Sequence, residues 1–250
     1  METALRTQGL RKTFGGLAAV DGVSLECRVG RVHAVIGPNG AGKTTLINLL
    51  TGVLRPHAGS VRLEGHDITR LAPQRRVALG LARTFQINQL FADMTPLETV
   101  GLAVSEHLGH GADWWRLAGG RQAIDARIAG ILERFHLADV MLSRTSQLPY
   151  GKQRLLEIAL AIACSPRVLL LDEPAAGVPE EERHEILAAV SALPREVSVL
   201  FIEHDMHIVF RFASHIIVLV GGAVFTQGTP KEISSDPGVR EVYLGTRKHG

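Results

Sequence analysis

A glycine-rich segment followed by a lysine and two threonines is the strongest chemical signal in the sequence. It reads Gly37-Pro38-Asn39-Gly40-Ala41-Gly42-Lys43-Thr44-Thr45. Glycines permit the tight turns that bring backbone N–H groups close to phosphate oxygens. In this pattern Lys43 supplies positive charge to the β- and γ-phosphates, and the Thr44 hydroxyl is placed for Mg²⁺. The segment predicts a P-loop that binds a nucleoside triphosphate.

Two acidic residues follow an apolar run further along the chain. Val168–Leu171 is followed directly by Asp172 and Glu173. Ligands of parallel sheets bind at the carboxyl ends of the strands, so both carboxylates are expected at the edge where the P-loop lies. Asp172 is then predicted to hold Mg²⁺ through water, and Glu173 to polarise an attacking water. An acidic turn after a strand is common by itself, and the upstream P-loop favours the catalytic interpretation.

A histidine at the end of the next predicted strand completes the candidate catalytic group. His204 stands in Phe201-Ile-Glu-His204-Asp. A single histidine at a strand end is more often structural, but the register places this one on the same edge as Glu173. A neutral imidazole there can hydrogen-bond the γ-phosphate or the water. His207 follows, but the pair does not match a metal-binding pattern. We predict Lys43, Glu173 and His204 as the catalytic residues.

The elements that must position these residues follow from periodicity and turn signals. A buried strand, Val32–Ile36, runs into the glycine loop, and a helix is expected over Lys43–Leu50. Helices are also expected over Leu155–Cys164, Glu180–Leu193 and Asp205–Ala213, alternating with strands Val168–Leu171, Val197–Ile202 and Ile216–Val220. This alternation predicts a parallel sheet covered on both faces.

Two other regions have a different character. Leu5–Leu10, Val20–Cys27 and Val61–Leu63 predict an antiparallel β layer. Thr95-Pro96-Leu-Glu98 is typical of a helix start, and a second helix is expected over Gln122–Phe135. Gly109–Gly120 is expected to be a loop whose pair Trp114-Trp115 either packs internally or faces a partner.

We expect one domain over 1–250, with a core of 1–88 and 156–228, a helical subdomain over 89–155 and a short polar tail over 229–250.

Composition and charge narrow the class of protein. The chain has 250 residues, of which 46% are apolar and 21% charged, as in ordinary globular proteins. A net charge of +2 gives no argument for a nucleic-acid partner. No apolar run approaches the roughly 20 residues of a membrane span, and the first residues do not read as a signal peptide. We expect a cytoplasmic protein, with Cys27 and Cys164 as small buried hydrophobes.

In this order the motifs resemble the ATP-binding-cassette (ABC) transporter ATPases over nearly the whole chain. The resemblance implies an α/β P-loop core with an N-terminal antiparallel β subdomain and an inserted α-helical subdomain. It implies ATP and Mg²⁺ as ligands. Phe14 matches the aromatic residue that stacks on adenine. Gln86, in Arg83-Thr-Phe-Gln86, matches the glutamine that senses Mg²⁺ and touches the membrane partner, so Mg²⁺ would be held by Thr44, Gln86 and Asp172.

The resemblance also assigns a segment that reaches across a dimer of cassettes. Leu148-Pro149-Tyr150-Gly151-Lys152-Gln153 stands where the family signature contacts the partner's ATP, and it is degenerate. Pro149 replaces a serine, Lys152 replaces a glutamine, and Pro179 replaces an Asp or Asn. We expect an asymmetric pair of sites. The site that uses this chain's Lys43 and Glu173 is competent if the partner's signature is sound, and the site that borrows this chain's signature is weaker. Gly151 and the helix after it remain, so an anion can still meet a helix N-terminus.

A narrower resemblance concerns the transported substrate. Gly37–Gly42, Arg83–Gln86, Asp172–Gly177, Ile202–Met206 and Val242–Gly245 are similar to the ATPase subunits of branched-chain amino acid and amide importers. This implies integral membrane permeases, a sister ATPase or second copy, and an external substrate-binding protein as partners. It places the chain at the cytoplasmic face of the membrane, without nucleic acid.

Two alternatives remain open at this point. An exporter ATPase for lipids or polysaccharides shares the core motifs. A soluble ABC ATPase that acts on ribosomes or DNA usually has two cassettes in one chain or long coiled-coil insertions, which this sequence lacks.

Overall fold

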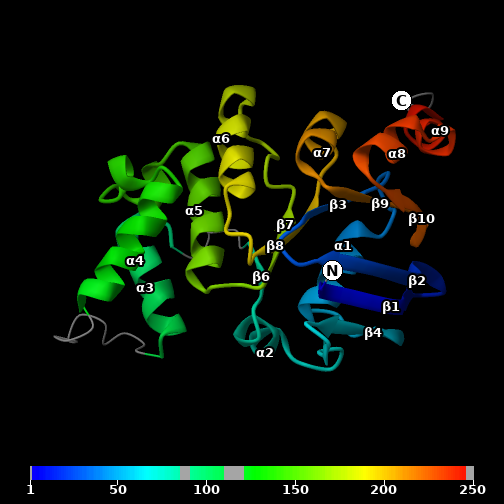
Figure 1. Ribbon diagram of the computed structural model, residues 1–250, viewed down its shortest axis with the longest axis horizontal. Helices are drawn as coiled ribbons and strands as arrows, with labels where there is room; N and C mark the ends of the chain where they lie inside the picture. The colour runs from blue at the N-terminus through cyan, green and yellow to red at the C-terminus, as the bar shows by residue number, and fades with distance from the viewer. Residues whose placement is uncertain (1, 85–90, 110–120, 246–250) are drawn as a thin grey trace. The chain divides into compact units, whose positions relative to one another are not determined.

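The computed structural model describes residues 2–84, 91–109 and 121–245 and divides into two compact units (Figure 1). The first unit comprises residues 1–82, 167–174 and 194–250, and the second comprises 83–166 and 175–193. The second unit contains the predicted subdomain 89–155 and also takes in flanking residues and 175–193. The predicted residues Gln86, Trp114 and Trp115 lie outside the described residues.

Two β-sheets build the first unit. The antiparallel sheet has the order β2-β1-β4-β5, and its strands are β1 (Thr3–Phe14), β2 (Leu17–Arg28), β4 (Ala58–Leu63) and β5 (His66–Asp67). The second sheet has the order β10-β9-β3-β8-β7-β6, and its strands are β3 (Val32–Ile36), β6 (Leu81–Arg83), β7 (Val168–Asp172), β8 (Ser198–Ile202), β9 (His215–Val220) and β10 (Ala223–Gly228). Strands β9, β3, β8 and β7 are parallel, and β10 is antiparallel to β9. The predicted antiparallel layer and parallel sheet are confirmed.

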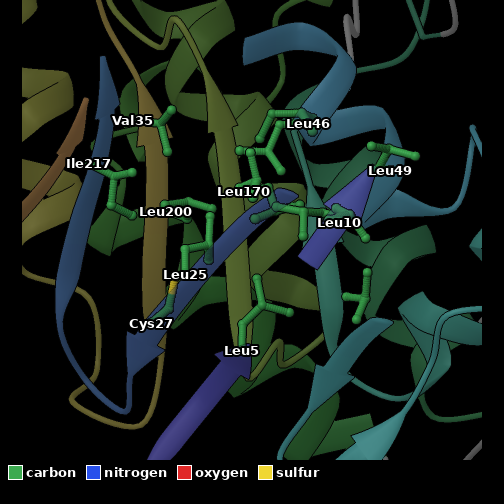
Figure 2. Packing of buried hydrophobic residues seen from close by; sticks show 14 of the residues in the cluster. Leu5, Leu10, Leu25, Cys27, Val35, Leu46, Leu49, Leu170, Leu200 and Ile217 are labelled. Atoms are coloured by element: carbon green, nitrogen blue, oxygen red, sulfur yellow. The ribbon is translucent and has the colours of Figure 1, made fainter. Parts of the chain in front are cut away.

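Side chains from both sheets and from helix α1 (Lys43–Thr51) form one hydrophobic core in this unit. Figure 2 shows Leu5, Leu10, Leu25, Val35, Leu46, Leu49, Leu170, Leu200 and Ile217 packed together. Alternate side chains of a strand point to opposite faces. Strands β7 and β8 are buried at both faces along nearly their whole length, which explains their continuous apolar sequences.

A buried arginine caps the carbonyl groups at the C-terminal end of α1. Arg76, in helix α2 (Pro73–Ala78), is 1% exposed. Its guanidinium donates to the carbonyl oxygens of Leu49 and Leu50, at 2.8 and 2.6 Å, and to two further carbonyl oxygens in the segment before α2. The last carbonyls of a helix lack partners within the helix, and positive charge complements that end of its dipole. Arg76 therefore joins α2 to α1 through the backbone.

We expect Arg76→Met to lower the free energy of unfolding by about 3 kcal/mol, because buried carbonyl groups lose their charged donor. Urea unfolding followed by circular dichroism measures the change. Arg75→Met is the matched control, since Arg75 is exposed in the same helix and should change stability by less than about 0.5 kcal/mol. Equal midpoints for the two variants would contradict the role given to Arg76.

The second unit is helical. It consists of α3 (Pro96–His107), α4 (Arg121–Arg134), α5 (Tyr150–Ala163) and α6 (Glu180–Ser191), with the short 3₁₀ helices η3 (Ala138–Val140) and η4 (Thr145–Gln147). The predicted start of α3 is confirmed, because Thr95 and Glu98 form a reciprocal capping box. The predicted apolar face of α4 is buried, including Ile124, Ile128 and Ile131.

The predicted start of one helix is wrong, and the predicted tail contains two helices. Helix α5 begins at Tyr150 and not at Leu155, because Pro149, with ψ of 149°, is its N-cap. The first turn is polar, so the apolar pattern starts later than the helix. The predicted polar tail contains α8 (Pro230–Ser235) and α9 (Pro237–Gly245). Helix α8 starts with a capping box of Thr229 and Glu232. None of the described helices is long and apolar enough to cross a membrane.

Candidate functional site

Three parallel strands end side by side in the first unit. The register pairs Val35 of β3 with Ile202 of β8, and Ile202 with Asp172 of β7. The glycine loop after β3, Glu173 after β7 and His204 after β8 therefore emerge at one edge of the sheet. The carboxyl edge of a parallel sheet is where such folds bind ligands.

The loop after β3 needs glycine at two positions. Gly40 and Gly42 have φ angles of +79° and +96°, in the region that favours glycine. A Cβ at Gly42 would lie 2.2 Å from the carbonyl oxygen of Ala19. Gly42 is also the N-cap of α1, and no side chain caps this helix. The first N–H groups of α1 thus lack a capping side chain, and such groups bind anions.

Lys43 is held by the loop that precedes it. Its side chain is buried, and Nζ donates to the carbonyl oxygens of Gly37 and Pro38 at 2.8 and 3.0 Å. Burial lowers the pKa of Lys43, whereas the negative charges of Glu173 and Asp172 act in the opposite direction. Both predicted carboxylates therefore lie close enough to act on the lysine. An ammonium has three protons, so one can be directed at a phosphate.

Glu173 and His204 are in direct contact. His204 Nε2 lies 2.5 Å from Glu173 Oε1, and the two side chains are 46% and 39% exposed. Glu173 has a φ of +50°, which is uncommon for a residue other than glycine. Its N–H donates to the carbonyl oxygen of Ile202 at 3.0 Å, which fixes this turn. Such conformations cluster at functional sites, and the pair is accessible to a bound substrate.

These groups share a cavity of about 310 Å³. It is lined by residues 17–19, 39–45, 173, 204 and 221. The structure thus brings Asn39, Gly40, Ala41, Gly42, Lys43, Thr44, Thr45, Glu173 and His204 together, as predicted. The predicted residues Phe14, Gly37, Pro38 and Asp172 are not in its lining.

Two strand connections supply lining residues that sequence reasoning missed. Leu17, at the start of β2, pairs with Phe14 at the end of β1, and both side chains are exposed. The register of this hairpin places Leu17 and the two alanines after it at the cavity. Gly221, in the turn between β9 and β10, lines it as well. No local motif marks these positions.

The family model described as ABC transporter matches residues 20–176. The chain belongs to the ABC transporter family. A second model, described as branched-chain amino acid ATP-binding cassette transporter, matches residues 224–249. The predicted family and its P-loop fold are confirmed.

Named relatives match this ABC protein over nearly its full length. The high-affinity branched-chain amino acid transport ATP-binding protein BraF of Pseudomonas aeruginosa is 40% identical, over 96% of this chain and 97% of that protein. LivG of Escherichia coli, described in the same words, is 38% identical, over 96% and 97%. The crystal structure of the ADP conformation of MJ1267, an ATP-binding cassette of an ABC transporter, matches with a TM-score of 0.84. It is 32% identical and covers 98% of this chain and 100% of that one.

The residues around the cavity of this ABC protein fit a hard cation. Thr44 is exposed in the cavity lining, and Asp172 is half-buried at the end of β7. Hydroxyl, carboxylate and phosphate oxygens are the ligands that Mg²⁺ prefers. The third predicted ligand, Gln86, lies outside the described residues. Within the described ranges no cluster of three or more His, Cys, Asp or Glu side chains could hold a metal.

The segment predicted as the ABC signature, Leu148–Gln153, lies at the start of α5 in the second unit. Pro149 is the N-cap and contributes no side-chain hydrogen bond. The N–H of Gly151 donates to Glu182 Oε2 at 2.9 Å. The helix terminus predicted to meet an anion thus already holds a carboxylate of α6.

Other side chains of this predicted signature segment also form contacts within that unit. Lys152 Nζ donates to the carbonyl oxygen of His136 at 2.5 Å and lies 3.7 and 3.6 Å from carboxylate oxygens of Asp139 and Glu185. Gln153 donates to the Leu148 carbonyl oxygen at 2.8 Å. The Tyr150 hydroxyl accepts from Arg154 at 2.7 Å.

Proposed function

We propose that this chain is the ATP-hydrolysing subunit of an ABC importer for branched-chain amino acids, other hydrophobic amino acids or amides. The observation that carries the hydrolytic activity is the Glu173–His204 contact in the same cavity as Lys43 and the start of α1. The names of BraF and LivG support the substrate class. The match to a branched-chain amino acid transporter model at residues 224–249 agrees with this class.

Each residue then has a defined task. The N–H groups at the start of α1 and the Lys43 ammonium bind the β- and γ-phosphates, and Phe14 stacks on the adenine. Glu173 orients a water in line with the γ-phosphate and accepts its proton, while His204 holds the Glu173 carboxylate in place. Thr44, Asp172 and Gln86 would hold Mg²⁺, which when bound would supply positive charge to the phosphates.

We infer that two cassettes close on ATP, each offering its signature segment to the other's P-loop. ATP drives transport only to the extent that it binds the closed state more tightly than the open one. The proposed partners are a sister ATPase or a second copy, integral membrane permeases at the cytoplasmic face of the membrane, and an external substrate-binding protein. Nucleic acid is not among them, and the net charge of +2 agrees with this.

The degenerate signature leads to a prediction about asymmetry. In the assembled transporter, Pro149→Ser should raise the ATPase rate about twofold to fivefold. A serine N-cap accepts a hydrogen bond from the first turn and adds a hydroxyl facing the partner's ATP. Ser146→Ala, an exposed change in the preceding 3₁₀ helix, is the control. An unchanged ATPase rate and unchanged nucleotide affinity would count against the weak-site hypothesis.

A pull-down tests the whole proposal. Tagged Glu173→Gln protein is expressed in its native host, membranes are solubilised with ATP and Mg²⁺, and co-purifying proteins are identified. We expect multi-span permeases and a sister ATPase, and an associated external binding protein would establish import. Recovery of the protein alone, or of ribosomal or DNA-bound proteins, would overturn the transporter assignment and leave only the ATPase.

A further inference from the structure

A second, larger cavity lies within the first unit, at the other end of strand β3. It has a volume of about 920 Å³ and is lined by β1, β2 and the starting ends of β3 and β9. We call it the basal cleft and define it by Arg6, Glu26, Arg28, Arg31, His33 and His215. The glycine loop follows the last residue of β3, whereas His33 is its second residue. The basal cleft is therefore distinct from the cavity at the P-loop.

The side chains around the basal cleft carry an excess of positive charge. Arg6, Arg28 and Arg31 line it, and Glu26 is the only acidic residue in the described lining. Glu26 lies 2.5 Å from Arg6 and neutralises that guanidinium. Arg28 and Arg31 are both exposed. Guanidinium groups pair in a planar, two-point manner with carboxylates and phosphates, so this lining suits an anion.

A buried histidine provides the second, independent observation. His33 is 2% exposed, and its Nε2 accepts a hydrogen bond from the Arg28 N–H at 3.0 Å. The neutral ring therefore carries its proton on Nδ1. That atom is buried and has no partner among the described residues. Arg6 Nε is also buried and has no hydrogen-bond partner among the described residues. Buried donors are normally satisfied, so two unpartnered donors beside one cleft indicate a missing acceptor.

The electrostatics of His33 agree with this interpretation. Burial lowers the pKa of His33 to about 4, and His215, Arg28 and Arg31 act in the same direction. The ring of His215 lies 5.5 Å from that of His33. These groups therefore create a positive electrostatic potential at the His33 imidazole. The Glu232 carboxylate acts on His215 rather than on His33.

We propose that the basal cleft binds a small organic anion that bears phosphate or carboxylate groups, held by Arg31 and the Nδ1–H of His33. Sites for small molecules have volumes of about 300–1,000 Å³, and the cleft falls within this range. A ligand oxygen at Nδ1 satisfies the buried donor, and guanidinium groups at the rim neutralise its charge. The inference does not rest on the proposed function, because it uses neither ATP nor a transport partner.

Isothermal titration calorimetry of the full chain tests the site. Saturating ADP and Mg²⁺ are present, so that the phosphate site at the P-loop is already filled. The probes are 3-phosphoglycerate, succinate and inorganic phosphate, which separate phosphate from carboxylate recognition, and glycerol is the uncharged control. We expect at least one anion to bind with a dissociation constant below about 1 mM, and to shift the Nδ1 resonance of His33 in ¹⁵N spectra.

Matched variants assign the binding to the cleft. Arg31→Gln, an exposed change that leaves the core intact, should weaken binding about tenfold through loss of a charged donor. Arg70→Gln, an exposed arginine outside the cleft lining, should leave the affinity unchanged. The proposal is overturned if no probe binds with a dissociation constant below about 1 mM, if both variants weaken binding equally, or if binding leaves the His33 resonance unmoved.

Discussion

Glu173→Gln is expected to reduce the steady-state ATPase rate by about 100- to 1,000-fold while ATP affinity stays near the wild-type value. The amide keeps the size of the carboxyl group and can still accept a hydrogen bond from His204, 2.5 Å away. It cannot take a proton from the attacking water. Loss of turnover without loss of binding is the result expected of a general base. Phosphate release and equilibrium nucleotide binding in the presence of Mg²⁺ measure the two quantities separately.

The position of Glu173 strengthens this expectation. The φ of +50° and the hydrogen bond to the Ile202 carbonyl oxygen hold the residue at the sheet edge. Glutamine can adopt the same backbone, so the variant should fold normally. Glu180→Gln removes an equal charge from an exposed position on α6 and should leave the rate unchanged. Wild-type hydrolysis in Glu173→Gln would overturn the assignment of the base, and lost nucleotide affinity would give Glu173 a role in binding.

Much of the nucleotide site could be predicted because its signals are local. Strand Val32–Ile36 has the predicted bounds, and α1 begins at Lys43 as expected. A continuous apolar run, glycines with a lysine, and an amphipathic segment each reflect short-range physics. Their order along the chain fixes which sheet edge they share, so the sequence alone predicts that Glu173 and His204 lie together.

The elements that were missed have weak or misread local signals. Helix α8 begins with Thr229, Pro230 and Glu232, the same residue types and spacing that correctly predicted α3 at Thr95. The signal was present, but the short, polar helix after it has little apolar periodicity. The predicted start of α5, Leu155, lies after the observed start, Tyr150, for a related reason: the first turn of this helix is polar and precedes the buried leucines.

Contacts set by tertiary register could not be derived from the sequence. Leu17 reaches the cavity because β1 and β2 pair across a tight turn, and Gly221 because β9 and β10 do. The hydrogen bond from Gly151 to Glu182 joins residues 31 apart on two helices. No periodicity predicts such a pairing. The unpartnered His33 Nδ1 is likewise visible only once the surroundings of the ring are known.

The second large effect is expected at Lys43. Lys43→Met should weaken ATP binding about 100-fold, since charge-assisted hydrogen bonds contribute roughly 1.5–3 kcal/mol each and a phosphate contact is lost. Methionine retains the apolar stem, which matters because Lys43 is only 7% exposed. Lys231→Met, on the exposed side of α8, is the matched control and should bind ATP normally. Equilibrium titration with a fluorescent ATP analogue measures the affinities.

Two causes of a lower ATP affinity in Lys43→Met must be distinguished: loss of a phosphate contact and disturbance of the glycine loop. Lys43 Nζ also bonds the carbonyl oxygens of Gly37 and Pro38, so its removal can disturb the loop itself. Thermal unfolding without nucleotide reports on the loop, and added ATP reports on binding. If Lys43 acts on the phosphates, ATP should raise the melting temperature of the wild type and of Glu173→Gln clearly more than that of Lys43→Met. An equal ATP-induced shift in all three proteins would show that Lys43 does not contact the nucleotide.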